Sequence, residues 1–171
     1  MARNVEIKAY ISSVSDLVAR VAPIASEGPI LIVQDDTFYQ CSAGRLKLRV
    51  FAEDSGELIF YRRADQAGPK ESFYVRTPTS CPALLGQTLA LAYGEIGRVR
   101  KQRTLFLVGR TRVHLDIVEG LGHFLELEVV LRDGESADDG VREAEHIMSS
   151  LAIDSSQLID RAYVDLLAAH K

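Results

Sequence analysis

The chain lacks tryptophan altogether and has only two cysteines, two methionines and five prolines in 171 residues. Cys41 and Cys81 do not have the spacing of a metal-binding pair, and in a chain without an export signal we expect both to be reduced. No apolar run approaches the roughly 18 residues that a membrane-spanning helix needs. Residues 1–8 carry charge from the start and contain no apolar signal segment. These absences predict a cytoplasmic protein without a membrane partner.

The chain also lacks an excess of basic residues. Its formal net charge is -4, with 26% charged and 47% hydrophobic residues. Proteins that bind nucleic acid through general electrostatic attraction are usually basic, so we expect no nucleic-acid partner. Any binding of an anion must then depend on local clusters of Lys and Arg. The length suits one globular domain over residues 1–171.

Most of the chain alternates between apolar and polar residues, which predicts β-strands. We expect strands at residues 4–10, 30–40, 45–51, 57–63, 71–76, 97–108, 110–119 and 124–131. We expect helices at residues 82–93, 138–151 and 155–168, and a short one capped by Ser15 or Asp16 and stopped at Pro23. About eight short strands with a few helices predict an α+β fold, a closed antiparallel β-barrel with helices packed outside.

The polar faces of several predicted strands carry charge rather than uncharged polar groups. These faces contain Glu6 and Lys8; Lys47 and Arg49; Lys101 and Arg103; Arg110, Arg112, His114 and Asp116; and Glu126 and Glu128. For any one strand, a solvent-exposed face is the more common explanation. The set as a whole, with cations alone on some strands and acids alone on another, indicates that these faces meet around one enclosed space.

Such a space suits a polyanion and a divalent cation. Arg and Lys match phosphate oxygens, and a triphosphate carries several negative charges. Hard cations such as Mg²⁺ or Mn²⁺ need oxygen ligands, which Asp116, Glu126 and Glu128 supply without a Cys or His. Glu126 and Glu128 are two apart on a strand, so they point the same way and can share a cation. We expect His114 to be a hydrogen-bonded structural residue rather than a proton carrier.

Several segments resemble the CYTH superfamily, which includes class IV adenylate cyclases, thiamine triphosphatases and inorganic triphosphatases. In chain order they are NVEIKAY, DTFYQCSAGRLKLR, ELIFYRRADQAGPKES, VRKQRTLFLVGRTRVHLD, VEGLGHFLELE and AYVDLL, and they span residues 4–167. The family signature E-x-E-x-K reads NVEIK at residues 4–8, so Asn4 replaces the first acid. Because an amide adds no charge, we expect weaker binding of a second metal ion.

The resemblance implies a barrel that forms a tunnel, with its charged residues pointing inward. It implies a metal site at Glu126 and Glu128, with Glu6 and Asp116 nearby, and catalytic roles for Lys8, Arg112 and Asp116. The phosphate-binding residues that it implies are Lys8, Lys47, Arg49, Lys101, Arg103 and Arg112, together with Arg63 or Arg62, a choice that the alternation leaves open. We expect Asp35, Asp36 and Tyr39 to be mainly structural and Lys70 to be solvated in a loop. Tyr163 either packs on the barrel or reaches the tunnel mouth.

Two reactions fit these residues. A cyclase directs the ribose 3′-hydroxyl of ATP at the α-phosphorus and releases pyrophosphate, whereas a triphosphatase directs water at the terminal phosphorus. The segment VEGLGHFLELE resembles the cyclase branch, so we predict a metal-dependent, class IV adenylate cyclase-like enzyme that acts on a small-molecule triphosphate. Hydrolysis of inorganic, thiamine or nucleoside triphosphate is nearly as well supported. A non-catalytic module that binds polyphosphate or a nucleotide is the second alternative, and a homodimer is compatible with each of these functions.

Overall fold

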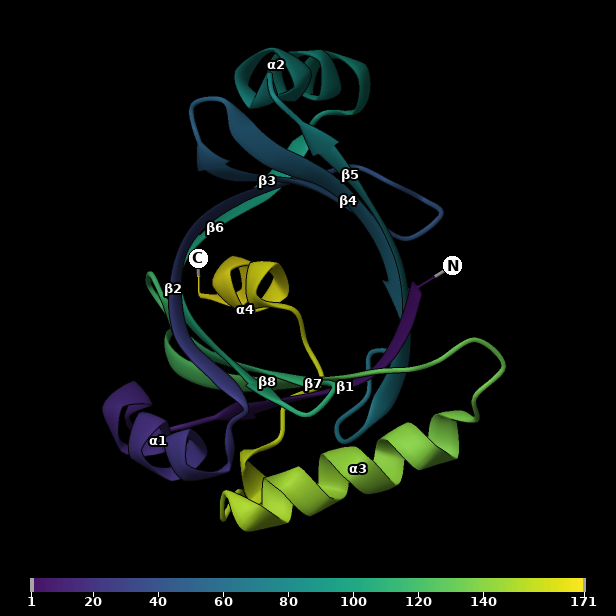
Figure 1. Ribbon diagram of the computed structural model, residues 1–171. Coiled ribbons are helices and arrows are strands. Elements are labelled where there is room, and N and C mark those ends of the chain that lie inside the picture. Colours follow the sequence, from purple (N-terminus) through teal and green to yellow (C-terminus); the bar gives the residue numbers. More distant parts are fainter. Residues whose placement is uncertain (1, 171) are drawn as a thin grey trace.

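The computed structural model describes residues 2–170. In this range eight antiparallel strands form a closed barrel in the order β1-β5-β4-β3-β2-β6-β7-β8 (Figure 1). The strands are β1 (Ala2–Tyr10), β2 (Glu27–Tyr39), β3 (Arg45–Ala52), β4 (Ser55–Arg63), β5 (Lys70–Thr79), β6 (Glu95–Val108), β7 (Thr111–Val118) and β8 (Gly122–Val130). The prediction of a closed α+β barrel with about eight strands is confirmed.

Helices cover the barrel from several sides. They are α1 (Val14–Val21), α2 (Pro82–Tyr93), α3 (Ala137–Ser150) and α4 (Tyr163–Ala169), with 3-10 turns at Ala22–Ile24 and Ser155–Gln157. Figure 1 shows α1, α2 and α3 outside the ring of strands, and α4 within its outline, where it lies over one end of the barrel. Of the helices between residues 2 and 170, none has both the length and the apolar character needed to cross a membrane.

Two predicted helix boundaries were wrong. The short first helix is capped by Ser13 rather than by Ser15 or Asp16, because the Ser13 hydroxyl accepts a hydrogen bond from the backbone N–H of Asp16 at 3.3 Å. In place of the single helix predicted at 155–168 the structure has a 3-10 turn at Ser155–Gln157 and the helix α4, which begins at Tyr163. The middle part of the predicted helix instead pairs with β1, where the N–H of Ile159 donates to the carbonyl of Lys8 at 3.0 Å. A long-range backbone contact therefore overrides the local helical pattern.

The hydrophobic core lies between the barrel and its helices rather than inside the barrel. Ile7, Leu115 and Leu127 are fully buried on the outer side of the strands, in the cluster that includes residues of α1 and α3. On the opposite side, Leu89 of α2 packs against Tyr39 and Leu48. Burial of a Leu or Ile side chain contributes about 1.5–3 kcal/mol. This outer core stabilises the barrel and leaves its interior free to hold charge.

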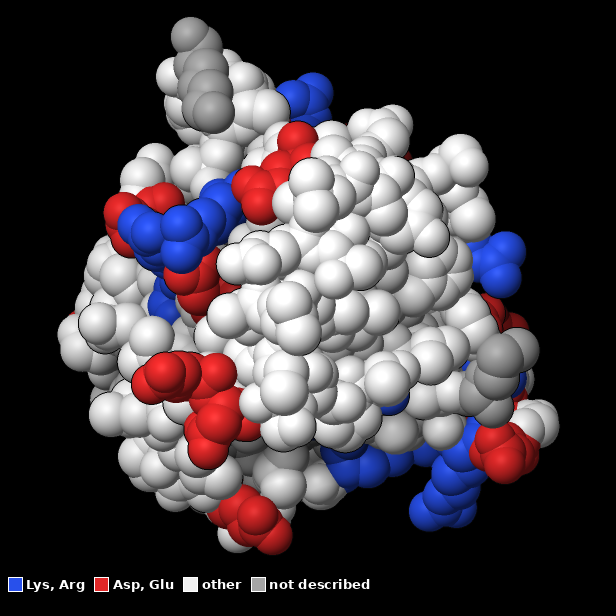
Figure 2. Space-filling view, turned by 90° about the horizontal axis from the view of Figure 1, so that it is seen from above, with Lys and Arg blue, Asp and Glu red and all other residues white. Residues whose placement is uncertain are grey.

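The outer face around α2 differs sharply from that interior. Residues 82–93 contain no Lys, Arg, Asp or Glu. In the view from above, the middle of this face is almost free of charged side chains, which gather near its edges (Figure 2). Most of the charges that the alternation predicts on one strand face lie inside the barrel instead.

The strand register determines which side chains share the interior. Across β1 and β8, Glu6 lies opposite Glu128 and Lys8 lies opposite Glu126. Because neighbouring residues of a strand point to opposite faces, a shift of one residue would turn the charged set to the outside. The outer core opposes such a shift, since it would bring the apolar residues into the tunnel.

Candidate active site

The barrel encloses a tunnel-like cavity of about 240 Å³ whose walls carry many charges. Among the described residues, the cations that line it are Lys8, Lys47, Arg49, Arg63, Arg76, Lys101, Arg103 and Arg112, and the acids are Glu6, Asp36, Glu57, Glu126 and Glu128. Each of the eight strands contributes at least one of them. Since cations outnumber acids, the cavity is suited to a polyanion.

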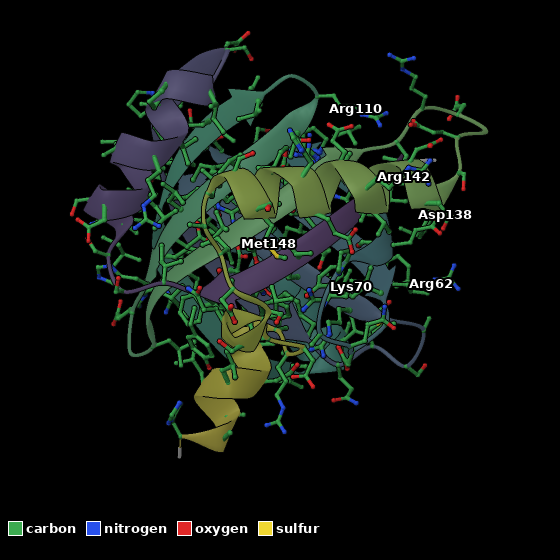
Figure 3. All side chains as sticks on the ribbon, turned by 90° about the horizontal axis from the view of Figure 1, so that it is seen from below. Arg62, Lys70, Arg110, Asp138, Arg142 and Met148 are labelled. Atoms are coloured by element: carbon green, nitrogen blue, oxygen red, sulfur yellow. The ribbon has the colours of Figure 1, made fainter. Side chains whose placement is uncertain are left out.

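All the cations that the sequence analysis assigned to phosphate binding face this cavity, and the choice between Arg62 and Arg63 is resolved. Arg63 lines the cavity and forms an ion pair with Glu6. Arg62 lies on the outer face, where its guanidinium is 5.4 Å from the ring centroid of Phe73. Figure 3 shows the Arg62 side chain pointing away from the barrel.

Arg110 does not share the tunnel face, contrary to the sequence analysis. The strand β7 begins one residue later, and Arg110 lies in the turn before it. Its guanidinium pairs with Glu135 at 2.6 Å and with Glu143 of α3 at 2.8 Å. These contacts attach α3 and the loop before it to the barrel.

Asp36 holds two of the tunnel cations in place. Its carboxylate accepts hydrogen bonds from the Nε and Nη2 of Arg49, both at 2.8 Å, and from the Nζ of Lys47 at 2.7 Å. Burial alone would raise the pKa of Asp36, but Arg49 and Lys47 hold it well below its usual range. The sequence analysis treated Asp36 as a structural residue, whereas it forms part of the tunnel wall.

Asp116 has the same arrangement on the other side of β6. It accepts hydrogen bonds from the Nε and Nη2 of Arg103 at 2.7 Å, and the Nζ of Lys101 lies 3.3 Å away. The hydroxyl of Tyr163 also donates to it at 3.0 Å. Asp116 is 0% exposed and is not part of the cavity lining. This placement favours an anchoring role over the predicted role as a metal ligand.

Glu126 and Glu128 form the acidic side of the tunnel together with His114. One ligand atom from each of these three residues lies within 4.8 Å of the other two. The Oε1 of Glu126 is 2.8 Å from Lys8, and the Oε2 of Glu128 is 2.8 Å from Arg112. Burial favours the neutral acid, but His114 and Arg112 lower the pKa of Glu128 to about 2. Both carboxylates are therefore ionised near neutral pH, since the pKa of Glu126 is also lowered.

His114 differs from the expectation of a hydrogen-bonded structural residue. Its Nδ1 atom is buried and has no hydrogen-bond partner among residues 2–170; it lies 3.7 Å from Glu126 and 3.9 Å from Glu128. Burial and the nearby Arg103 lower the pKa of His114, so its ring is neutral at pH 7. A neutral imidazole beside two carboxylates is able to supply a nitrogen ligand in addition to the all-oxygen set that the sequence analysis considered.

Asn4 and Gln34 line the cavity as uncharged polar groups. Each has a buried side-chain oxygen for which the described part of the chain provides no hydrogen-bond partner. Asn4, which replaces an acid of the family signature, is 2% exposed. Its amide oxygen is available to a group inside the tunnel.

Tyr163 closes the tunnel at the α4 end. Its ring lies 3.9 Å from the Nζ of Lys8 and packs on Phe124, with 4.8 Å between ring centroids. Of the two placements that the sequence analysis left open, Tyr163 thus takes the one that reaches the tunnel. Lys70, by contrast, is buried in β5 rather than solvated, and its Nζ donates to the carbonyl of Gln66 at 2.7 Å.

Several tunnel residues were not identified from the sequence. They are Gln34, Asp36, Glu57, Tyr61, Tyr74 and Arg76. In β2 the alternation is hidden, because Leu31 and Val33 are exposed and apolar while Gln34 and Asp36 are buried and polar. In β5 a signal was present, since Tyr74 and Arg76 are two residues apart and share a face.

Comparisons with known proteins agree with this geometry. The CYTH domain model matches residues 2–163. A putative adenylate cyclase of Methanocaldococcus jannaschii is 33% identical over 44% of this chain, a match that spans 43% of that protein. The adenylate cyclase CyaB of Aeromonas hydrophila is 22% identical over 87% of this chain and 82% of its own.

A solved structure supports the fold. The protein from Hippeastrum, described as a putative adenylyl cyclase with a dominant triphosphatase activity, superposes with a TM-score of 0.66 over 100% of this chain and 97% of its own, at 14% identity. A likeness at this identity concerns the fold alone, and the closed barrel of this chain shares that fold. On the match across nearly its whole length, the chain belongs to the CYTH domain family.

Proposed function

We propose that this protein is a divalent-metal-dependent enzyme that binds a triphosphate in the tunnel, and that it converts ATP to cyclic AMP and pyrophosphate. The observation that carries the proposal is the joint presence, in one cavity, of eight cationic side chains and of the Glu126, Glu128 and His114 cluster. The two adenylate cyclase names among the relatives support the choice of reaction.

The cations would bind and orient the phosphates. Arg49 and Arg103 each donate two N–H groups to a buried aspartate and keep further N–H groups for phosphate oxygens. Because these guanidinium groups are already in place, little reorganisation is needed when charge develops on the phosphates. Lys8 and Arg112, now paired with Glu126 and Glu128, lie where they can contact the same phosphates.

The residues present fit a divalent ion. Glu126 and Glu128 would hold it, with His114 Nδ1 as a third ligand, since these groups are close together and no residue that the structure describes forms a hydrogen bond with the Nδ1. When bound, Mg²⁺ or Mn²⁺ supplies neutralisation of phosphate charge and orientation of the phosphate oxygens. Asp116, fully occupied by Arg103, Lys101 and Tyr163, would position those residues.

Hydrolysis of a triphosphate is the second candidate. It is favoured by the Hippeastrum neighbour, whose description gives a dominant triphosphatase activity to a putative cyclase. The same cations and acids serve both reactions, which differ in whether a ribose hydroxyl or water attacks the phosphorus. A non-catalytic anion binder fits less well, because carboxylates that face phosphates would weaken binding in the absence of a metal ion.

The test is product analysis with ATP, thiamine triphosphate and inorganic triphosphate in parallel, each with Mg²⁺, Mn²⁺ or EDTA. Cyclic AMP with equimolar pyrophosphate supports the cyclase, and phosphate without a cyclic product supports the triphosphatase. Glu126→Gln and Glu128→Gln should abolish metal-dependent turnover, whereas Glu145→Gln, an exposed acid on α3, should not. Turnover that persists in EDTA, or in both tunnel variants, would contradict the metal site.

A further inference from the structure

The tunnel contains two Lys-x-Arg pairs that are mounted in the same way. In each pair the Arg lies directly opposite an Asp of the neighbouring strand, Arg49 opposite Asp36 and Arg103 opposite Asp116. In each, the Arg donates through Nε and Nη2 to both carboxylate oxygens, and the Lys reaches the second oxygen. The two aspartates thus perform the same structural task at two places in the wall.

The two Lys-x-Arg pairs differ in the other side chains that hold them. Arg103 also pairs with Glu126 at 2.6 Å, and Asp116 is bound by Tyr163 as well. Within residues 2–170, Asp36 is the sole carboxylate within 4.0 Å of the nitrogens of Lys47 and Arg49. The position of these two cations therefore depends on one side chain that is itself 1% exposed.

We propose that Asp36 is a positioning residue for triphosphate binding, which acts by aiming Arg49 and Lys47 into the tunnel without touching the phosphates itself. This inference rests on the proposed function. The fork of Arg49 has five N–H donors, of which Asp36 takes two, and the ammonium of Lys47 has three, of which Asp36 takes one. The remaining donors stay available, and their ordering is complete before the anion arrives.

The charge of Lys47 depends on the same carboxylate. Burial and the charge of Arg49 lower the pKa of Lys47 to about 7, and Asp36 opposes this shift. The other groups that face Lys47 do little to stabilise its charged form. Lys101 of β6 also carries positive charge, and the rings of Phe38 and Tyr61 lie 5.4 and 5.7 Å from the Lys47 Nζ. Removal of the Asp36 charge should therefore lower the pKa of Lys47 further, so that Lys47 loses its charge at a lower pH.

The test is the binding of inorganic triphosphate to the full chain by calorimetry between pH 6 and 8.5, without metal, together with KM and kcat for the triphosphate that the protein turns over. Asp36→Asn should weaken binding and raise KM by about 10- to 100-fold, with a smaller change in kcat. We also expect affinity to fall as the pH rises and Lys47 loses its charge, and in Asp36→Asn this fall should occur at a lower pH. Asp36→Glu should recover part of the affinity.

Asp35→Asn is the matched control. The Asp35 carboxylate accepts the same two hydrogen bonds from an arginine, Arg98, at 2.7 and 2.5 Å. Asp35 precedes Asp36 in β2, so its side chain lies on the outer face of the barrel. The Asp35→Asn variant should bind inorganic triphosphate with the affinity of the native chain and should have the same KM. A folded Asp36→Asn protein with the affinity and pH profile of the native chain would overturn the inference.

A second measurement keeps the inference testable if Asp36→Asn does not fold. Lys47→Met, with Asp36 intact, removes one of the two cations that Asp36 holds, so it should weaken binding. It should also flatten the loss of affinity that we expect for the native chain as the pH rises through about 7. A Lys47→Met protein that binds inorganic triphosphate as tightly as the native chain does would also overturn the positioning role, because Lys47 would then not contact the anion. If the native chain neither binds nor turns over any triphosphate, the proposed function fails as well, whereas normal turnover with an inert Asp36 overturns the positioning role alone.

Discussion

A single methyl group at Gly97 should displace α4 from the end of the tunnel. A Cβ at this position of β6 would lie 2.5 Å from the Cγ2 of Val164 in α4. Carbon atoms in favourable contact are about 3.5–4.0 Å apart, so in Gly97→Ala one element must move by roughly 1 Å. Val164 is buried and β-branched, so its side chain cannot easily turn away. The strain must then be relieved by movement of α4.

The expected cost follows from overpacking. An added methyl group in a well-packed site destabilises by about 1–3 kcal/mol. In a domain of this size each kcal/mol lowers Tm by about 2–4 °C, so Gly97→Ala should melt roughly 2–12 °C lower than the native chain. Tyr163, the neighbour of Val164, lies 3.9 Å from Lys8, so the turnover of triphosphate should fall too.

The assay is urea unfolding of Gly97→Ala, Val164→Ala and the double variant. Since the alanine at position 164 removes the clashing methyl group, the two changes should not add, and the methyl at position 97 should cost about 1–2 kcal/mol less in the double variant. Strictly additive effects would refute this reasoning, as would a Gly97→Ala protein with native stability, because either result means that the two elements do not press on each other.

Two further predictions concern charges in the tunnel. The pKa of Glu128 is about 2 against an ordinary value of 4.5, so its contribution to stability is complete above about pH 4.5 and is lost as the pH falls towards 2. Urea unfolding of Glu128→Gln should therefore depend less on pH in this window than that of the native chain, and an equal dependence would argue against the lowered pKa. Arg63→Ala should raise KM for the triphosphate by about 10-fold, whereas Arg62→Ala on the outer face should leave it unchanged. Equal effects of the two variants would contradict the assignment of Arg63 to the tunnel.

Much of the site could be predicted because strand geometry is local. The alternation in β3 and β6 places Lys47 with Arg49 and Lys101 with Arg103, and in β8 it places Glu126 with Glu128. All of these side chains face the tunnel. Two successive residues on one strand must point to opposite sides, whatever the strand pairs with. A pattern of this kind can be read without any knowledge of the rest of the chain.

Where both faces of a strand are apolar, the alternation of polar and apolar residues does not predict which side chains face the tunnel. In β4, Ile59 and Tyr61 point into the tunnel while Leu58 and Phe60 belong to the outer side, so hydrophobicity does not tell Arg62 from Arg63. The choice depends on the register with β3 and β5.

Local pattern therefore established the barrel, the cationic strands and the acidic strand of this protein. The roles of Asp36, Asp116 and Tyr163 required the closed fold, because each depends on partners from another strand or helix. Asp36 and Asp116 each lie 13 residues from the arginine they hold, and Tyr163 lies 47 residues from Asp116. The distance between such groups is set by the strand register, the closure of the barrel and the position of α4. The pattern of neighbouring residues in the sequence does not reveal these three features.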